Sequence, residues 1–216
     1  MPTATTELVV TLNDGVAVLA GVHSIPTTIE TSVQMHIVGV HFRSGGAFPF
    51  LGVPPRDLHN ETVPLDAIWG SDAAITRDQI LSAPDDETRF DILEQTLLLH
   101  ASRLQRHRAV AHALKRLGRA SVADIAEETG FSQRRFIELF EGEVGLTPKL
   151  FARIQRFQCV LRRVHRATDV DWSDVAVDCG YFDQSHLIND FRSFAGMTPT
   201  DYVAQKTEHL NHVPVL

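Results

Sequence analysis

Near the start of the chain, apolar residues fall into short runs separated by turn residues, a pattern typical of β-strands. The runs ELVVTL (7–12) and GVAVLAGV (15–22) flank an Asn-Asp-Gly turn at 13–15, which predicts a hairpin. A third run, MHIVGVHF (35–42), is rich in Val and Ile and predicts another strand. The Gly- and Pro-rich segment 43–58 predicts an irregular loop. We therefore expect strands and loops in this first part.

Beyond Pro84 the apolar residues adopt the spacing of a helix. Asp85, Asp86 and Glu87 stand at its start, where the helix dipole favours negative charge. The residues that keep the spacing, and that we expect on the buried face, are Phe90, Leu93, Leu97 and Leu104. The chain beyond is helical in pattern throughout, so we place a domain boundary at 100–108, in the basic segment SRLQRHR.

Two segments of the helical part resemble each other. DIAEETGFSQRRFIELFEGEVGLTPKLF begins at Asp124, and DVAVDCGYFDQSHLINDFRSFAGMTPTDY begins at Asp174. The first matches, at Asp124, Ala126 and Gly130, are with residues 50 positions later. The second segment then has one extra residue, so the later matches are 51 positions apart. The residues that match at the second spacing are Gln133, Phe136, Ile137, Phe140, Gly145, Thr147 and Pro148. Matches at glycines and apolar positions, with a single insertion, indicate one structural unit carried twice.

Each copy predicts a short helix, a tight turn and a second helix. Gly130 and Gly180 stand at the turns, where the left-handed backbone that ends a helix favours glycine. Residues that can cap the helices stand at their expected starts: Ser121 with Asp124, Ser132, Asp171 and Asp183. Two helices joined in this way form a helix-turn-helix unit.

The second helix of each unit has an apolar face and a polar face. The apolar faces consist of Phe136, Ile137 and Phe140, and of Leu187, Ile188 and Phe191. The polar faces consist of Ser132, Gln133, Arg134, Arg135 and Glu138, and of Asp183, Gln184, Ser185, His186, Asn189 and Arg192. Arg can bond guanine, Gln and Asn can bond adenine, and Glu can accept from cytosine. An ordinary solvated face is the alternative, but two copies in register favour an interface with the major groove of DNA.

A single amphipathic helix is predicted between the two units, over residues 148–166. Thr147 caps it, and Pro148 occupies the first turn, where the missing N–H costs nothing. Its apolar side carries Phe151, Ile154, Phe157, Leu161 and Val164. The arginines around it are expected to face solvent or DNA phosphates: Arg153, Arg156, Arg162, Arg163 and Arg166. Thr198-Pro199 repeats the cap and starts a last helix.

Composition is that of a globular protein, with 44% hydrophobic residues in a chain of 216. Two cysteines are too few for a disulfide framework, and no apolar run is long enough to span a membrane, so we expect a cytoplasmic protein. Residues 1–99 hold 4 Lys/Arg against 13 Asp/Glu, whereas residues 100–206 hold 16 against 13. This asymmetry favours a polyanionic partner for the second half, although two differently charged globular halves explain it too.

With these motifs in place, residues 108–206 resemble the DNA-binding domain of the AraC/XylS family of bacterial transcription regulators. The resemblance rests on the tandem units, the bridging helix and the signature GYFDQSHL…F…FAGMTP (180–199). The segment GVHFRSGGAFPFLGVPPRDLHNETVPLDAIWG (39–70) is similar to the N-terminal domain of one branch of that family. The start, MPTATTELVV, resembles the middle of such a domain, so we expect a shortened N-terminus.

The resemblance implies an α+β N-terminal domain (1–100) that senses or dimerises, followed by an all-α tandem helix-turn-helix domain (108–206). The units span 121–142 and 172–194, and residues 207–216 form a tail. Double-stranded promoter DNA is the implied partner in transcription regulation. RNA polymerase, a small-molecule effector and a second copy of the chain are further candidate partners, while no membrane partner, cofactor or enzymatic activity is expected.

Two residues depart from the family pattern, in which Arg often stands at the positions of Glu138 and Asn189. Losing two cations weakens the attraction to phosphates, so DNA affinity is expected to be modest or to depend on dimerisation. A sensor or anti-regulator that has kept the fold without binding DNA is therefore the alternative function.

Two kinds of enzyme are alternatives to a DNA-binding protein. A metal site in the N-terminal half would draw on His36, His41 and His59, but the chain has no His-x-His pair there, and surface histidines explain these residues better. A DNA-repair alkyl acceptor needs an activated thiolate. Cys159 and Cys179 fall in predicted packed helices, so we expect both to be structural.

Overall fold

The computed structural model describes residues 1–27, 35–101, 105–165, 167, 169–209, 211 and 213. Four antiparallel strands form a sheet in the N-terminal half, in the order β3-β1-β2-β4. The strands are β1 (Thr6–Thr11), β2 (Ala17–Ala20), β3 (Ile37–Phe42) and β4 (Thr62–Pro64). The predicted hairpin and third strand are confirmed, and Gly15 has the positive φ of 70° that its turn requires. The three-residue β4, which ends in a proline, was not predicted.

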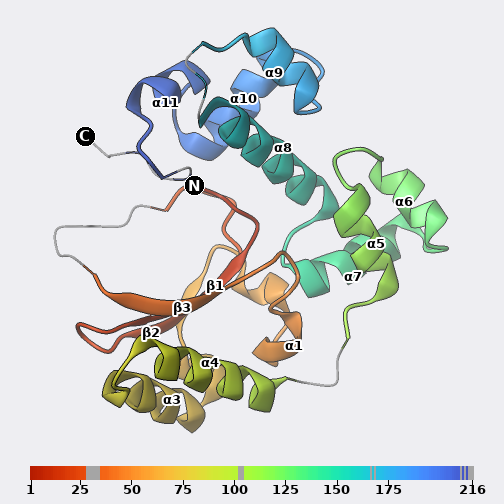
Figure 1. Cartoon of the computed structure of the whole chain (residues 1–216). Coiled ribbons are helices and arrows are strands. Elements are labelled where there is room, and N and C mark those ends of the chain that lie inside the picture. The colour runs from red at the N-terminus through yellow and green to blue at the C-terminus, as the bar shows by residue number, and fades with distance from the viewer. Residues whose placement is uncertain are drawn as a thin grey trace.

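The segment expected to be an irregular loop contains two short helical turns, α1 (Phe48–Leu51) and η1 (Pro55–Leu58). After α2 (Asp66–Trp69), the helices α3 (Ser71–Ser82) and α4 (Asp86–His100) lie together against one side of the sheet (Figure 1). α3 was not predicted, because its buried residues are the small or weakly apolar Ala73 and Thr76 together with Ile80. Without a continuous apolar stripe, its sequence has no helical signature.

α4 begins where predicted, with the Asp85 side chain accepting a hydrogen bond from the N–H of Thr88. The expectation that Phe90 lies on the buried face was wrong: it is 56% exposed. Arg89 turns toward α3 instead, because its guanidinium donates to the carbonyl oxygens of Ile80 and Ala83 at the end of that helix. Leu93 is buried as predicted, and Leu104 lies outside the described residues.

The second half is helical, as predicted. Its helices are α5 (Arg108–Arg116), α6 (Val122–Glu128), α7 (Gln133–Val144), α8 (Pro148–His165), α9 (Trp172–Asp178), α10 (Gln184–Ala195) and α11 (Pro199–Gln205). In Figure 1, α8 runs from the group α5–α7 at one end to the group α9–α11 at the other. The α+β half followed by an all-α half is the fold class expected from the sequence.

Apolar side chains form two cores. One joins the sheet to α3 and α4 through residues such as Leu8, Ile80 and Leu93. The other fills the helical half and also takes in Ala4 and Val22 from the N-terminal half, so the two halves pack against each other. The domain boundary at 100–108 stays a prediction, since residues 102–104 lie outside the described part of the chain. No helix of that part is long and apolar enough to cross a membrane.

Candidate nucleic-acid interface

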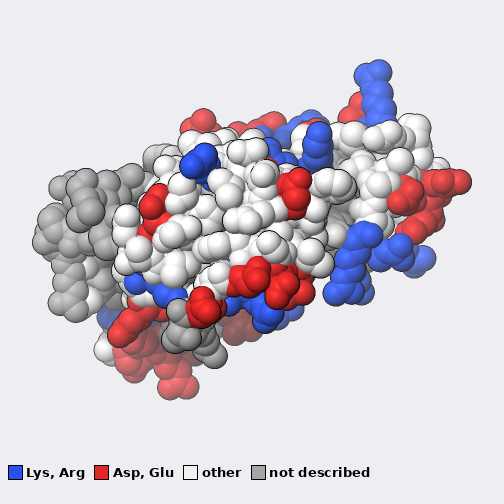
Figure 2. All heavy atoms as spheres, turned by 90° about the horizontal axis from the view of Figure 1, so that it is seen from above, with Lys and Arg blue, Asp and Glu red and all other residues white. Residues whose placement is uncertain are grey.

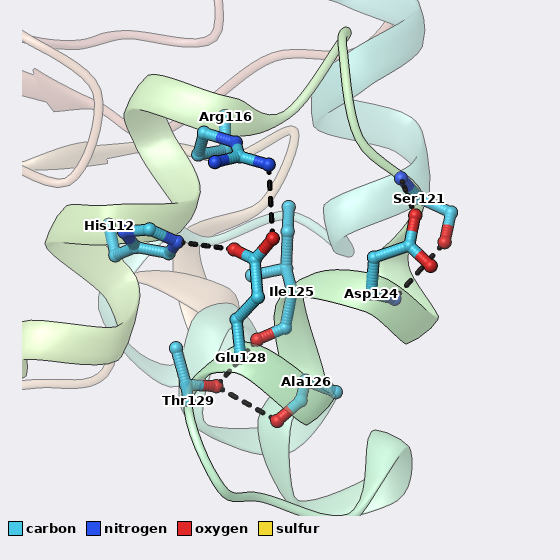
Figure 3. Close-up of polar contacts among 8 residues, drawn as sticks. All are labelled: His112, Arg116, Ser121, Asp124, Ile125, Ala126, Glu128 and Thr129. Atoms are coloured by element: carbon cyan, nitrogen blue, oxygen red, sulfur yellow. Dashed lines mark hydrogen bonds and ion pairs between the residues drawn. The ribbon is translucent and has the colours of Figure 1, made fainter.

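The first helix-turn-helix unit is formed by α6 and α7. Ser121 and Asp124 form the predicted capping box at the start of α6, with each side chain bonded to the other residue's N–H (Figure 3). At the end of α6, the Glu128 carboxylate pairs with His112 at 2.7 Å and with Arg116 at 3.0 Å. Both partners lie on α5, so this carboxylate ties the unit to the preceding helix.

The second unit, α9 and α10, repeats the local geometry of the first. The Asp171 side chain accepts from two N–H groups at the start of α9, as predicted. The turn glycines have almost the same backbone conformation, with φ of 74° at Gly130 and 76° at Gly180. Ser132 and Asp183 cap the second helices by accepting from the N–H three residues later. The duplication read from the sequence is therefore a duplication in structure.

Each second helix buries most of its apolar face, although Ile137 and Ile188 are only half-buried, and leaves the start of its polar face in solvent. Phe136, Phe140, Leu187 and Phe191 are at most 1% exposed. The residues of the predicted interface that are exposed are Ser132, Gln133, Arg134, Arg135, Asp183, Gln184, Ser185, Asn189 and Arg192. Glu138 and His186 are half-buried. The predicted polar residues thus lie on the two outward faces, one on each unit.

Two of the predicted arginines are held by an acid of the same helix. Glu138 accepts a hydrogen bond from Arg134 at 3.1 Å and pairs with Arg135 at 3.5 Å. The bond from Arg134 lowers the pKa of the Glu138 carboxyl below its ordinary value. A nucleic acid approaching this face meets two cations that already share one anion, and it has to compete for them.

His186 differs from the other predicted contact residues because part of its ring faces the protein. The ring lies edge-on to Tyr181, with centroids 5.1 Å apart. Its Nε2 atom lies 4.0 Å from a carboxylate oxygen of Asp190 on the same helix. This side chain contributes to the packing of the second unit as well as to its surface.

The arginines of α8 brace the second unit. Arg153 donates two hydrogen bonds, of 3.0 and 2.8 Å, to the buried carboxylate of Asp190 on α10, and Arg156 lies 3.8 Å from the same group. Arg163 pairs with Asp178 of α9 at 2.9 Å. Arg162 and Arg163 are exposed to solvent, as expected. Arg153 and Arg156 are half-buried against Asp190, so for these two the prediction was incomplete. Arg166 lies outside the described side chains.

Figure 2 shows the face that lies at the top in Figure 1, on the side of α9–α11. Basic and acidic side chains adjoin one another around the rim of that face, and single charged side chains stand on a broad area of uncharged residues. A surface of this kind differs from a continuous basic stripe.

The histidines considered as metal ligands are separate in the structure. His41 pairs with Glu7 at 3.0 Å, His59 bonds Ser24 at 2.9 Å, and His36 is exposed. Within the described ranges, no three His, Cys, Asp or Glu side chains are grouped to hold a metal ion.

The two cysteine thiols lie in hydrogen-bond contact between α8 and α9. The bond from Cys179 lowers the pKa of Cys159, whereas the same bond and burial raise the pKa of Cys179. Both cysteines are expected to be structural, and that stays a prediction. Access is also required for alkyl transfer. Cys159 is half-buried and Cys179 is buried.

Two helix-turn-helix units of matching geometry, joined by one helix, define a tandem helix-turn-helix protein. Residues 125–205 match a family described as a helix-turn-helix domain, and residues 1–64 match a domain family of unknown function. The probable transcriptional regulator LumQ of Photobacterium leiognathi is 30% identical over 82 residues, which is 38% of this chain and 33% of that protein. The XylDLEGF operon transcriptional activator 1 of Pseudomonas putida is 28% identical over 88 residues, which is 40% of this chain and 27% of that protein.

The helical half of the chain is similar to transcription regulators of the AraC/XylS family. The chain spans about a third or less of the length of these two relatives. Among solved structures, the DNA-binding domain of AdpA in complex with a target DNA is 29% identical, with a TM-score of 0.40, over 44% of this chain and 86% of that one. Apo ToxT from Vibrio cholerae is 10% identical, with a TM-score of 0.45, over 92% of this chain and 85% of that one.

Proposed function

We propose that this protein binds promoter DNA in a sequence-specific manner through both helix-turn-helix units and thereby regulates transcription in the cytoplasm, without catalysing a reaction. One observation carries the proposal. Both units bury the apolar face of their second helix and leave its first turn, with Gln133, Arg134 and Arg135 or with Gln184 and Ser185, open to solvent. The first turn of such a helix is the part that reaches base edges in the major groove.

The length of α8 suits two units that read neighbouring grooves. Its 18 residues span about 27 Å at 1.5 Å per residue. Successive major grooves on one side of a duplex are about 34 Å apart. The two lengths are of the same order, which supports the proposal that both second helices reach the same side of the DNA.

We assign Arg134 and Arg135 to bases or phosphates in one groove, and Gln184, His186 and Asn189 to base edges in the next. The hydroxyl of Ser132 and the carboxylate of Asp183 cap their helices, so their main part is to set where each helix begins. Arg192 supplies the second unit with a cation suited to a phosphate.

Affinity is expected to be modest. Glu138 competes with DNA for Arg134 and Arg135, and the uncharged Asn189 stands where the family often has a cation. Dimerisation through the N-terminal domain, proposed here as 1–100, would raise the effective concentration of a second pair of units. A small-molecule effector bound to that domain and RNA polymerase contacting the DNA-bound protein complete the proposal.

The proposal is tested by selecting binding sites with the purified chain from a randomised duplex library and then measuring affinity by fluorescence anisotropy over a range of salt. Arg134→Ala/Arg135→Ala should weaken binding by about 1–3 kcal/mol where an arginine reads a base. Where an arginine contacts a phosphate, the slope of log K against log salt concentration should become less steep by about 1 for each arginine. Glu138→Gln should strengthen binding, because it frees both cations.

Arg77→Ala is the matched control, since Arg77 is also a helix-surface arginine paired with a neighbouring acid but lies on α3. It should leave affinity unchanged. If the wild-type chain selects no duplex, the proposal fails, and the alternative of a sensor that does not bind DNA takes its place. If the wild-type chain selects a duplex and Arg134→Ala/Arg135→Ala binds it with wild-type affinity, the assignment of the first unit is wrong.

A further inference from the structure

Phe182 is the extra residue that distinguishes the second unit from the first. Up to Tyr181 the two units match at a spacing of 50 residues, and from Asp183 they match at 51. In the first unit, Phe131 is followed directly by the cap Ser132. The insertion therefore falls between the turn and the second helix of the second unit, immediately before the turn of helix proposed to enter the groove.

The side chain of Phe182 is 90% exposed, more than any other large hydrophobic residue among those described. Single exposed apolar residues are common on protein surfaces and need no explanation by themselves. Here the exposed ring coincides with an insertion and adjoins Gln184 and Ser185, which are proposed to meet DNA. That combination points to a ligand-facing role.

The backbone on both sides of Phe182 is held in place. Tyr181 is 5% exposed, with its ring packed against His186 and the Arg156 guanidinium 5.4 Å from its centroid. On the other side, the Asp183 carboxylate accepts from the N–H of His186 at 2.7 Å. An exposed ring on a fixed base loses little conformational freedom on binding, which favours a contact there.

A phenyl ring cannot hydrogen-bond to a base edge. The one apolar group that the bases present in the major groove is the C5-methyl of thymine, and Phe is among the residues that contact it. We propose that Phe182 selects a thymine through this methyl group at the edge of the half-site read by α10. The inference rests on the proposed DNA binding and extends it to a residue outside the predicted interface.

The same geometry predicts an asymmetry between the two half-sites. In the first unit the residue beside the cap Ser132 is Phe131, which is half-buried with its ring packed edge-on to His107, so no exposed ring stands there. A preference for a thymine methyl should therefore appear in one half-site only.

The test uses duplexes selected from a randomised library by the wild-type chain, in which each thymine is replaced in turn by deoxyuridine. This change removes only the C5-methyl and keeps base pairing. One replacement should weaken wild-type binding about fourfold, the effect of losing one buried methyl group. Phe182→Ala should bind the parent duplex more weakly by at least that factor and should no longer respond to the replacement.

Val177→Ala is the control, because Val177 is 72% exposed on α9 of the same unit but lies outside the proposed interface. It should keep both wild-type affinity and the response to deoxyuridine. Equal behaviour of Phe182→Ala and wild type would overturn the inference while leaving the proposed function intact. A wild-type chain that selects no duplex would overturn both. Circular dichroism checks that each variant is folded.

Discussion

At the scale of single residues, two glutamates of α7 show how surroundings set the behaviour of one side-chain type. Glu138 is half-buried, and its hydrogen bond from Arg134 lowers its pKa. Glu143, at the other end of the helix, is only 6% exposed, and burial raises its pKa. Its two carboxylate oxygens accept from the N–H of His107 at 3.1 and 3.0 Å, which offsets part of that effect.

The raised pKa of Glu143 predicts a stability difference that depends on pH. Because its folded-state pKa lies above the unfolded value of about 4.3, the native state keeps the proton over a range in which the unfolded chain has lost it. Wild-type stability should therefore fall, relative to Glu143→Gln, as pH rises above about 4.3, and the difference should level off above the raised pKa. Urea unfolding at a series of pH values measures it.

Glu94→Gln, on the exposed side of α4, is the control for the loss of one charge. A difference between wild type and Glu143→Gln that does not change with pH would show that burial leaves this carboxyl unperturbed.

At the scale of elements, α8 is more than a spacer between the two units. Its apolar side contributes Ile154, Phe157 and Leu161 to the core, all of them fully buried. Its polar side holds the second unit through Arg153 and Arg156, which meet Asp190 of α10. The orientation of α10 is therefore tied to α8 by apolar packing and by a largely buried ion pair.

Asp190→Asn tests that tie. The change leaves two mostly buried guanidinium groups without their anion, and it should destabilise the fold by about 3 kcal/mol, the lower end of the range for breaking a buried pair. Asp178→Asn is the matched control, because Asp178 joins α9 to α8 through an exposed pair with Arg163. Exposed pairs contribute roughly 0–1 kcal/mol. Equal losses in urea unfolding would contradict the importance of burial at Asp190.

At the scale of the whole molecule, the acidic half and the helical half are packed together. η1 lies against α7, and the buried Gln158 of α8 donates to the carbonyl oxygen of Pro2 at 2.6 Å. Gly145, which ends α7 with a φ of 86°, also lies close to η1. A Cβ atom added there would lie 3.0 Å from the carbonyl oxygen of Pro55.

Gly145→Ala measures this contact. It should cost the roughly 1–2 kcal/mol of placing a non-glycine residue in the left-handed region, plus the displacement of η1. Gly196→Ala is the matched control, because Gly196 ends α10 with a φ of 72° and has no atom within 4 Å of an added Cβ. The loss of unfolding free energy should be larger at Gly145. Equal losses would mean that Pro55 does not constrain this position.

The sequence by itself determined the features that depend on neighbouring residues. Periodicity predicted three strands and the helices of both units, and Ser121, Ser132, Asp171 and Asp183 predicted where four of those helices start. Capping and amphipathicity act over a few residues, so they can be read along the chain. For the same reason the outward faces of α7 and α10 were predicted correctly as exposed surfaces, while their contacts with DNA stay a prediction.

Only the tertiary structure decided which distant group each polar side chain meets. Asp190 lies among polar residues of α10, and nothing in its neighbours identifies Arg153, 37 positions away, as its partner. Phe90 is exposed, whereas its neighbour Arg89 donates to carbonyl oxygens at the end of α3, a helix without an apolar stripe. Such pairings depend on how whole elements pack, and packing joins residues that leave no common pattern in the chain.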